Sequence, residues 1–328
     1  MKKRMAIIIL IGAMLLTFTA CKHAVYSAPA DVGPVFESLA ELAAYLATAA
    51  GGYNPANAIP IAVNIYLGTM TDPNSGWRQL LGILESAGKL VALDLSNSSC
   101  NYNVFAPDSS LNTGKEFIVS LVLPATATNI PDVYEEEVDE DDLLVINSAF
   151  DWFSNLNACS GVNITSIGDW AFFGCPALKS VNFPAVKSIG EFAFWHCDGL
   201  QSVSFPAAKS IGDNAFEDCI ALKSVSFPVA QIIGEHAFYG CDDIQSVNIT
   251  AVTDIGYNAF ARTYISADLI ITMGNPAPYV GGRIFGNHGG GARPITIRVP
   301  AAALASYDAA WRDTVIGSSD HTLTFVMY

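Results

Sequence analysis

The side chains of this chain that could carry chemistry are its cysteines, its histidines and one run of acids. A structural zinc site needs four thiolate or imidazole ligands at short, paired spacings. The five histidines are scattered, and four of the seven cysteines recur every 22 residues: Cys175, Cys197, Cys219 and Cys241. That interval belongs to a structural repeat and not to a ligand set, so the sequence predicts no metal site.

Motifs for catalysis are missing too. The chain has no nucleophile elbow, phosphate-binding loop or dinucleotide fingerprint. Gly289 to Gly291 lack the flanking strand and helix of a phosphate cradle, and no serine has a histidine placed by a motif. We therefore expect no catalytic residue and no cofactor, and an enzyme is only the outside alternative.

The acids are concentrated in an insertion over residues 132–145. Asp132 to Asp142 carry eight acids in eleven residues. Self-repulsion favours a solvated loop. The alternative is a weak calcium site, because carboxylate oxygens are calcium ligands, although the run lacks the alternating spacing and the glycine of an EF-hand loop.

The cysteines allow two interpretations. An even number in an exported chain is compatible with disulfides. The four at 22-residue spacing occupy an inward position of the repeat, where a free thiol packs as a small hydrophobe. We expect a column of buried free thiols, and we leave the state of Cys100 and Cys159, which are out of register, open.

The elements that position these residues form a repeat. From Ser166 to Thr253 the chain repeats with a period of 22 residues, marked by an invariant glycine: Gly168, Gly190, Gly212, Gly234 and Gly256. A fixed period in this range is typical of a solenoid, in which each unit buries its apolar face against its neighbours.

One copy predicts the outline of the fold. Val181 and Phe183 have the alternation of a short strand that Pro184 ends, and Glu191 is suited to the start of a short helix. The expected fold is an α/β repeat solenoid with a parallel β-sheet on one face and short helices on the other. Its core should contain one phenylalanine and one cysteine from each copy: Phe172, Cys175, Phe194, Cys197, Phe216, Cys219, Phe238 and Cys241.

The repeated pattern Ile-Gly-(Asp/Glu)-x-Ala-Phe-x-x-Cys-x-x-Leu-x-Ser-Val-x-Phe-Pro resembles the BspA-like leucine-rich repeats of bacterial cell surfaces. Apolar residues replace the asparagine ladder of common leucine-rich repeats, a departure that belongs to this bacterial type: Val186, Ala208, Ala230 and Val252. The resemblance implies a binding protein that adheres to host proteins or to other bacterial surface proteins.

The N-terminus looks like an export signal. Basic residues and an apolar run too short to span a bilayer make up a signal peptide over residues 1–20. Cys21 follows small residues, as at the cleavage site of a lipoprotein, and we predict that it is lipidated and anchors the chain to a membrane. Ordinary cleavage and secretion is the alternative.

Composition is consistent with export. Hydrophobic residues make up 51% of the chain, which allows a large core, and the formal net charge is −15. A chain so acidic has no basic stripe to neutralise phosphates, which argues against nucleic acid as a partner. The expected location is the cell surface or outer membrane.

The remaining chain is divided by pattern. A tether should cover residues 21–37, irregular N-terminal repeats or a cap residues 38–131, regular repeats residues 146–274, and a C-terminal loop and cap residues 275–328. Capping units of solenoids are atypical, because they must cover an exposed core. A small separate α/β domain is the alternative for residues 38–131.

The candidate binding surface consists of aromatic residues at variable positions of the repeat: Trp170, Phe173, Phe192, Trp195, His236 and Tyr239. Aromatic side chains are enriched at interfaces. Packing of these rings on neighbouring copies is the alternative. The sequence thus favours a protein-binding or adhesive surface protein over a structural envelope protein, and over a calcium-dependent or carbohydrate-binding module.

Overall fold

The computed structural model describes residues 33–107, 113–132, 136–138, 144–146, 148–262, 269–285, 294–316 and 322–328. Residues 32–328 form one compact unit. The predicted signal peptide, Cys21 and the first part of the tether lie outside the described residues. So does most of the acidic insertion, within which β8 (Glu136–Val138) and β9 (Leu144–Ile146) pair as an antiparallel hairpin.

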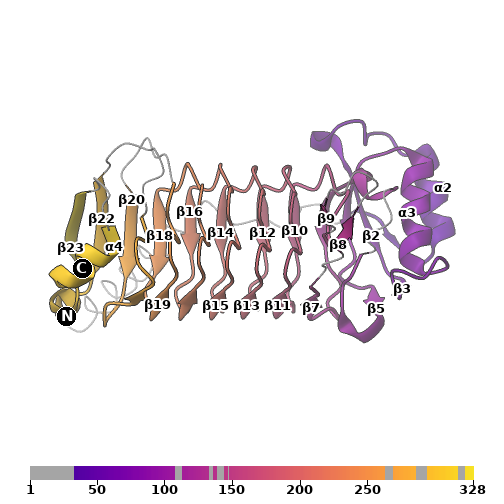
Figure 1. The fold of residues 1–328 in the computed structure, drawn as a ribbon. Coiled ribbons are helices and arrows are strands. Elements are labelled where there is room, and N and C mark those ends of the chain that lie inside the picture. The colour runs from indigo at the N-terminus through magenta and orange to yellow at the C-terminus, as the bar shows by residue number, and fades with distance from the viewer. Residues whose placement is uncertain are drawn as a thin grey trace, which may run out of the picture. The chain divides into compact units, whose positions relative to one another are not determined.

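Parallel strands dominate the described chain, and neighbouring coils contribute neighbouring strands (Figure 1). The first sheet has the order β1 (Val35–Phe36), β2 (Ile59–Val63), β4 (Val91–Asp94), β6 (Ile118–Val122), β10 (Ala158–Ser160) and β12 (Ser180–Asn182). The corresponding strands of later coils form a further sheet: β14 (Ser202–Ser204), β16 (Ser224–Ser226), β18 (Ser246–Ile249), β20 (Leu269–Met273), β22 (Pro294–Val299) and β23 (Thr322–Met327).

A sheet of two-residue strands runs along another side of the coils. Its order is β7 (Asn129–Ile130), β11 (Ser166–Ile167), β13 (Ser188–Ile189), β15 (Ser210–Ile211), β17 (Ile232–Ile233), β19 (Asp254–Ile255) and β21 (Tyr279–Val280). Residues one period apart are partners, as Ser188 and Ser210 are. Each regular copy is therefore one coil with two strands, and the predicted leucine-rich repeat solenoid is confirmed.

The short helices predicted on the other face of the regular repeats are wrong. Turns follow the glycine of each copy instead. Phe192 and His196 have φ angles of +54° and +55°, which a right-handed helix does not allow. The N–H of Phe192 also donates to Asp213 O of the next coil, at 3.0 Å, where a helix would use the fourth preceding carbonyl. The backbone hydrogen bonds thus connect coils.

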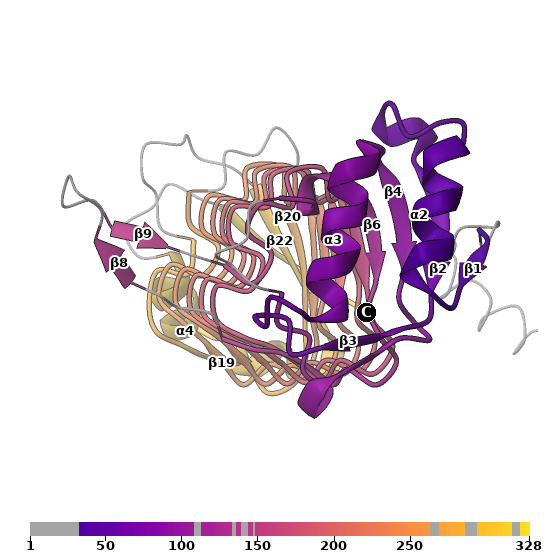
Figure 2. The same ribbon diagram turned by 90° about the vertical axis from the view of Figure 1, so that its right-hand side faces the viewer.

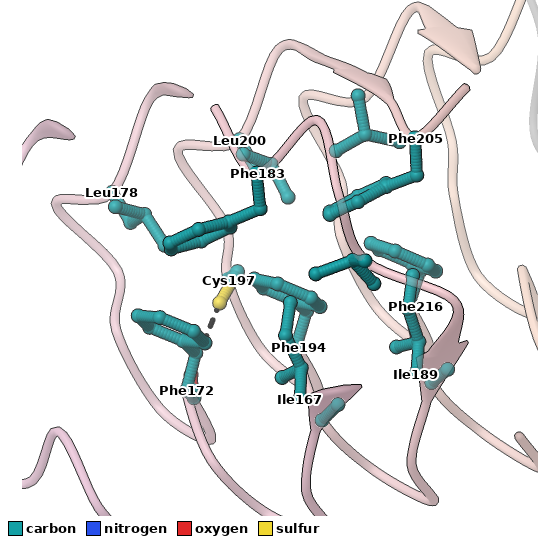
Figure 3. Packing of buried hydrophobic residues seen from close by; sticks show 14 of the residues in the cluster. Ile167, Phe172, Leu178, Phe183, Ile189, Phe194, Cys197, Leu200, Phe205 and Phe216 are labelled. Atoms are coloured by element: carbon teal, nitrogen blue, oxygen red, sulfur yellow. Dashed lines mark hydrogen bonds between the residues drawn. The ribbon is translucent and has the colours of Figure 1, made fainter. Parts of the chain in front are cut away.

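Aromatic rings stack along the centre of the coils. Phe172 and Phe194 have ring centroids 4.9 Å apart, and Phe194 and Phe216 5.0 Å, with planes within 4° of parallel in both pairs. Figure 3 shows this stack beside a second column that contains Phe183 and Phe205. All eight side chains assigned above to the repeat core are buried in the structure.

The repeat cysteines line the same interior. Each thiol donates to a phenylalanine carbonyl of the preceding coil, as Cys197 Sγ does to Phe172 O at 3.1 Å (Figure 3). The six described cysteines, Cys100 and Cys159 included, are free. Burial raises the pKa of Cys197 well above its ordinary value and that of Cys175 to about 12.

Helices occur in the N-terminal units. α2 (Leu39–Thr48) and α3 (Gly76–Ala87) begin at serine caps, and the side chain of Ser75 accepts a hydrogen bond from Arg78 N. Their apolar faces join the core beneath β2, β4 and β6 (Figure 2). β6 in turn pairs with β10, so these units share a sheet with the first repeats. A separate short pair is formed by β3 (Tyr66–Gly68) and β5 (Ser99–Cys100).

Near the C-terminal end a helical segment is divided into a 3-10 helix, Ala301–Ser306, and α4 (Ala309–Ile316). Tyr307 interrupts it with ψ of 57°. Its buried hydroxyl donates to Gly274 O at 2.9 Å, and Asp308 Oδ1 then accepts from Trp311 N at 2.8 Å to start α4. Burying this tyrosine against the core explains the interruption. β23 then pairs with β22 at the end of the sheet.

Candidate binding surface

The turn of each coil that follows the glycine carries the candidate residues. Successive turns lie very close together: a Cβ on Gly190 would stand 2.3 Å from Asp169 Oδ1 and 2.6 Å from Asp169 N. The same Asp169 Oδ1 accepts a hydrogen bond from Glu191 N at 2.7 Å. Glycine and carboxylate together fix the register of one turn on the next, and so they fix the side chains that follow.

Four of the candidate rings meet on two neighbouring coils, and we call them the aromatic surface: Trp170, Phe173, Phe192 and Trp195. Trp170 stacks on Phe192 of the next coil with centroids 4.2 Å apart and planes at 16°. Trp195 closes the group against Phe173 at 5.2 Å and against Trp170 at 5.7 Å. All four remain partly exposed.

The alternative interpretation, packing on neighbouring copies, is confirmed, and the binding role of the rings stays a prediction. The rings pack on neighbouring copies, yet each also contributes to the outer surface. The exposed ring of His196 extends the group, because it stacks on Trp195 with centroids 5.0 Å apart. Mutual packing immobilises the rings, so little side-chain entropy remains to be lost when a partner covers them.

His236 and Tyr239 are not part of this group. The coil between them and Trp195 has Asn214 and Glu217 at the same positions, hydrogen-bonded to each other. His236 instead contacts Tyr239, with centroids 5.3 Å apart, and its Nε2 lies 3.2 Å from Asn258 Nδ2 of the following coil. The structure thus joins four of the six candidates and places the other two in a second, smaller group.

Trp152 was missed by the sequence analysis. It is 52% exposed and lies in the coil before Trp170, with φ of +68°. The signal was present, since aligning Phe150 with Phe172 puts Trp152 in the column of Gly174 and His196. Its coil pairs with that of Trp170 through the backbone, as Phe150 N donates to Ala171 O at 3.0 Å.

A column of carboxylates beside the rings was also missed as a surface feature. One acid per coil immediately follows the glycine position: Asp132, Asp169, Glu191, Asp213 and Glu235. Three of these are tied to the next turn by backbone hydrogen bonds, which Asp132 Oδ1, Asp169 Oδ1 and Asp213 Oδ1 accept. Desolvation, and then repulsion from Asp169 and Asp213, raises the pKa of Glu191.

The strand side of the repeats is different in kind. Its outward positions carry hydroxyl groups, such as those of Ser202, Ser204 and Ser226. Lysines such as Lys179 and Lys223 directly precede the strands. Within the described residues no group of three or more His, Cys, Asp or Glu side chains is arranged to hold a metal ion. None of the described helices has the length and apolar character needed to cross a membrane.

The comparison with protein families finds a match over the repeats. Residues 145–266 match the model of the BspA type leucine rich repeat region, in 6 copies. This segment is thus similar to BspA-type leucine-rich repeats, and the match covers less than half of the chain. The region contains all six candidate residues and Trp152, and its six copies correspond to the six Ala-Phe pairs from Ala149–Phe150 to Ala259–Phe260.

Solved structures with similarity to this chain include other leucine-rich repeat proteins. A leucine-rich cell surface protein of Faecalibacterium prausnitzii A2-165 has 18% identity and a TM-score of 0.38 over 56% of this chain and 63% of its own. A leucine-rich repeat protein of Bacteroides ovatus ATCC 8483 has 19% identity and a TM-score of 0.34 over 64% and 61%. The match thus spans less than two thirds of either protein's length. No curated protein matches this chain.

Proposed function

We propose that this chain is a lipid-anchored bacterial surface protein whose BspA-type solenoid binds other proteins through the aromatic surface. The observation that carries the proposal is the group of four partly exposed rings on adjacent coils, with Trp170 stacked on Phe192 at 4.2 Å. Tryptophan and other aromatic residues dominate the binding energy of protein interfaces.

The scaffold supports this role. Turn-to-turn hydrogen bonds and the buried phenylalanine stack hold the rings on a rigid framework. A solenoid presents such a surface without a central active-site cavity, and its repeats supply shape while variable positions supply specificity. The rings stand at such variable positions, since the same columns hold Asn214 and Glu217 one coil later.

The anchor is supported by the sequence. A basic start, an apolar run and Cys21 after small residues indicate export and lipidation. The expected result of protease treatment of intact cells is digestion of the native chain, with release of a Cys21→Ala form into the medium. Protection on intact cells would place the chain inside the envelope and would contradict a surface role.

The binding claim is tested with purified protein. Wild-type chain and a Trp170→Ser, Trp195→Ser variant are immobilised and probed with a panel of purified host extracellular and bacterial surface proteins. A matched control is Tyr102→Ser, which removes a 91% exposed ring from the N-terminal units.

We expect at least one panel protein to bind wild type and the control equally and to bind the double variant more than tenfold more weakly, since truncating an interface tryptophan often costs about 2 kcal/mol or more. Thermal unfolding followed by circular dichroism checks that the variant is folded. Equal binding to all three proteins would contradict the aromatic surface as the binding site.

A further inference from the structure

The turns of the repeat region carry a row of negative charges. The carboxylate column lies on the turn side, directly before the ring positions in sequence. Between residues 133 and 178 the chain has no lysine or arginine. Lys179 directly precedes β12, whereas Lys187 directly precedes β13, the short strand that leads into the turn of Glu191. Two rings of the aromatic surface, Trp170 and Phe192, thus directly follow carboxylates in sequence.

The spacing of this column follows from the sheet. Neighbouring parallel strands lie about 4.8 Å apart, so Asp169 and Glu235, three coils apart, are separated by roughly 14 Å. Four carboxylates lie within that length, and the pKa of Glu191 is raised by desolvation and then by repulsion from Asp169 and Asp213. No ion pair to Asp169, Glu191 or Asp213 is found among the described residues.

The acidic insertion begins at the same column of carboxylates. It leaves the coil at Asp132 and returns at Ser148, in the coil immediately before Trp170, and Asp132 Oδ1 accepts from Asp169 N at 2.9 Å. The sequence places seven further acids between these two points. The described carboxylates Asp169 and Glu191 of the column directly precede two of the rings in sequence, and their charge would attract an oppositely charged partner from solution.

We propose that the aromatic surface binds a cationic polypeptide segment whose arginine or lysine side chains pair with Asp169, Glu191 and Asp213 and lie over the rings of Trp170 and Trp195. This assignment rests on the proposed function and names the chemistry of the partner. Tryptophan is the best aromatic acceptor for a cation over its face, and arginine pairs with a carboxylate through two parallel hydrogen bonds.

A neutral partner fits the site less well. Covering the rings with an uncharged chain would also desolvate carboxylates that start one residue away, with no cation to compensate them. A cationic segment satisfies both features at once. An extended chain advances about 3.3 Å per residue, so four to five residues match the roughly 14 Å length of the column.

The test uses three synthetic peptides of about ten residues, which is longer than the column. They alternate glycine with arginine, with glutamine or with glutamate, and both ends are blocked. Binding is measured by titration calorimetry at low and at physiological salt. The charge variant is Asp169→Asn with Glu191→Gln, in which the new amide oxygen at position 169 still accepts from the backbone of residue 191. The matched control, Glu41→Gln with Glu85→Gln, removes the same charge from exposed positions on α2 and α3.

We expect the arginine peptide to bind, the glutamine peptide to bind at least about tenfold more weakly, and the glutamate peptide not to bind. The charge variant should lose roughly tenfold in affinity for the arginine peptide, the sum expected for two exposed ion pairs and their share of the cation–aromatic contact. The control should stay within about twofold, because its charges are remote and screened.

Two results would overturn the cationic assignment. The first is equal affinity of the wild-type chain for the glutamine and arginine peptides. The second is an equal loss of affinity for the arginine peptide in the charge variant and in its control, because that result indicates unspecific attraction to an acidic chain. If in these cases the Trp170→Ser, Trp195→Ser variant still loses its panel partner, the proposed function stands without the cationic partner. If that variant loses nothing, both fail.

Discussion

Replacing Phe194 by alanine tests whether the stacked rings hold the solenoid together. Phe194 is fully buried, with parallel neighbours Phe172 at 4.9 Å and Phe216 at 5.0 Å and a tilted contact to Phe205 at 6.2 Å. Truncation of a buried phenylalanine costs about 3–5 kcal/mol through lost transfer energy and the cavity that remains.

We place the loss for Phe194→Ala at the upper end, about 4–5 kcal/mol, because three ring contacts disappear together and each aromatic pair contributes about 0.5–1.5 kcal/mol beyond burial. Phe194→Leu should lose much less, about 1–2 kcal/mol, since it keeps most of the volume. Trp152→Ala is the matched control at a ring that is 52% exposed, and it should change stability by no more than about 1 kcal/mol.

The assay is urea unfolding followed by far-ultraviolet circular dichroism, with free energies from linear extrapolation. A loss below about 1.5 kcal/mol for Phe194→Ala, or a loss no larger than that of Trp152→Ala, would refute the reasoning, given the usual cost of such a truncation. It would mean that the ring column does not carry the packing between coils.

Three further outcomes follow from the same geometry. Gly190→Ala should cost about 1–3 kcal/mol in urea unfolding, because its Cβ would meet Asp169 backbone, whereas Gly82→Ala in α3, with open space around it, should gain about 0.5–1 kcal/mol; equal effects would contradict the close turn packing. The six described cysteines should resist iodoacetamide at pH 8 in the native chain and react on denaturation, since all are buried; rapid native labelling would contradict their placement. Burial raises the pKa of these thiols above the ordinary 9.0. Their contribution to the free energy of unfolding is therefore fully present below pH 9 and is lost as the pH rises further, by up to about 1.4 kcal/mol per pH unit for each thiol. Burial lowers the pKa of Lys115 to about 8, so this single group makes the free energy of unfolding rise with pH instead. Because the thiols outnumber it, stability measured by urea unfolding should fall between pH 9 and 10. A rise in stability over that range would contradict this balance.

Much of the repeat core was predictable from sequence. The period of 22 residues fixes which side chains recur at one depth, and Phe194 and Cys197 are buried as that period requires. Strand positions followed from alternation and from proline, as Val203 and Phe205 before Pro206 illustrate. Periodicity is the part of a solenoid that sequence states most directly.

The turns were not predictable in the same way. Phe192 and His196 adopt left-handed φ angles that bulky residues rarely take, so their residue types gave no warning. Hydrogen bonds from the N–H of Phe192 and other turn residues to the next coil offset that cost, and a single copy cannot reveal them. For the same reason, the division of the six candidate aromatics into two groups emerged only once neighbouring coils were in place.

The carboxylate column could not be predicted from the pattern within one copy. Glu191 was visible in the sequence as a helix-start residue, and only the close turn-to-turn contact shows it and Asp169 as members of one column beside the rings. Whether a residue faces solvent or a neighbour depends on contacts between copies, which the pattern within one copy does not contain.

The central claim is that partners cover the aromatic surface. Hydroxyl-radical footprinting with mass spectrometry measures it most directly, by comparing oxidation of each tryptophan in the free chain and in a complex with a panel protein that binds. The account predicts that oxidation of Trp170 and Trp195 falls several-fold in the complex, while Trp311, which donates to Pro278 O at the C-terminal end, is unchanged. Unchanged oxidation of Trp170 and Trp195, with protection elsewhere on the chain, would contradict it.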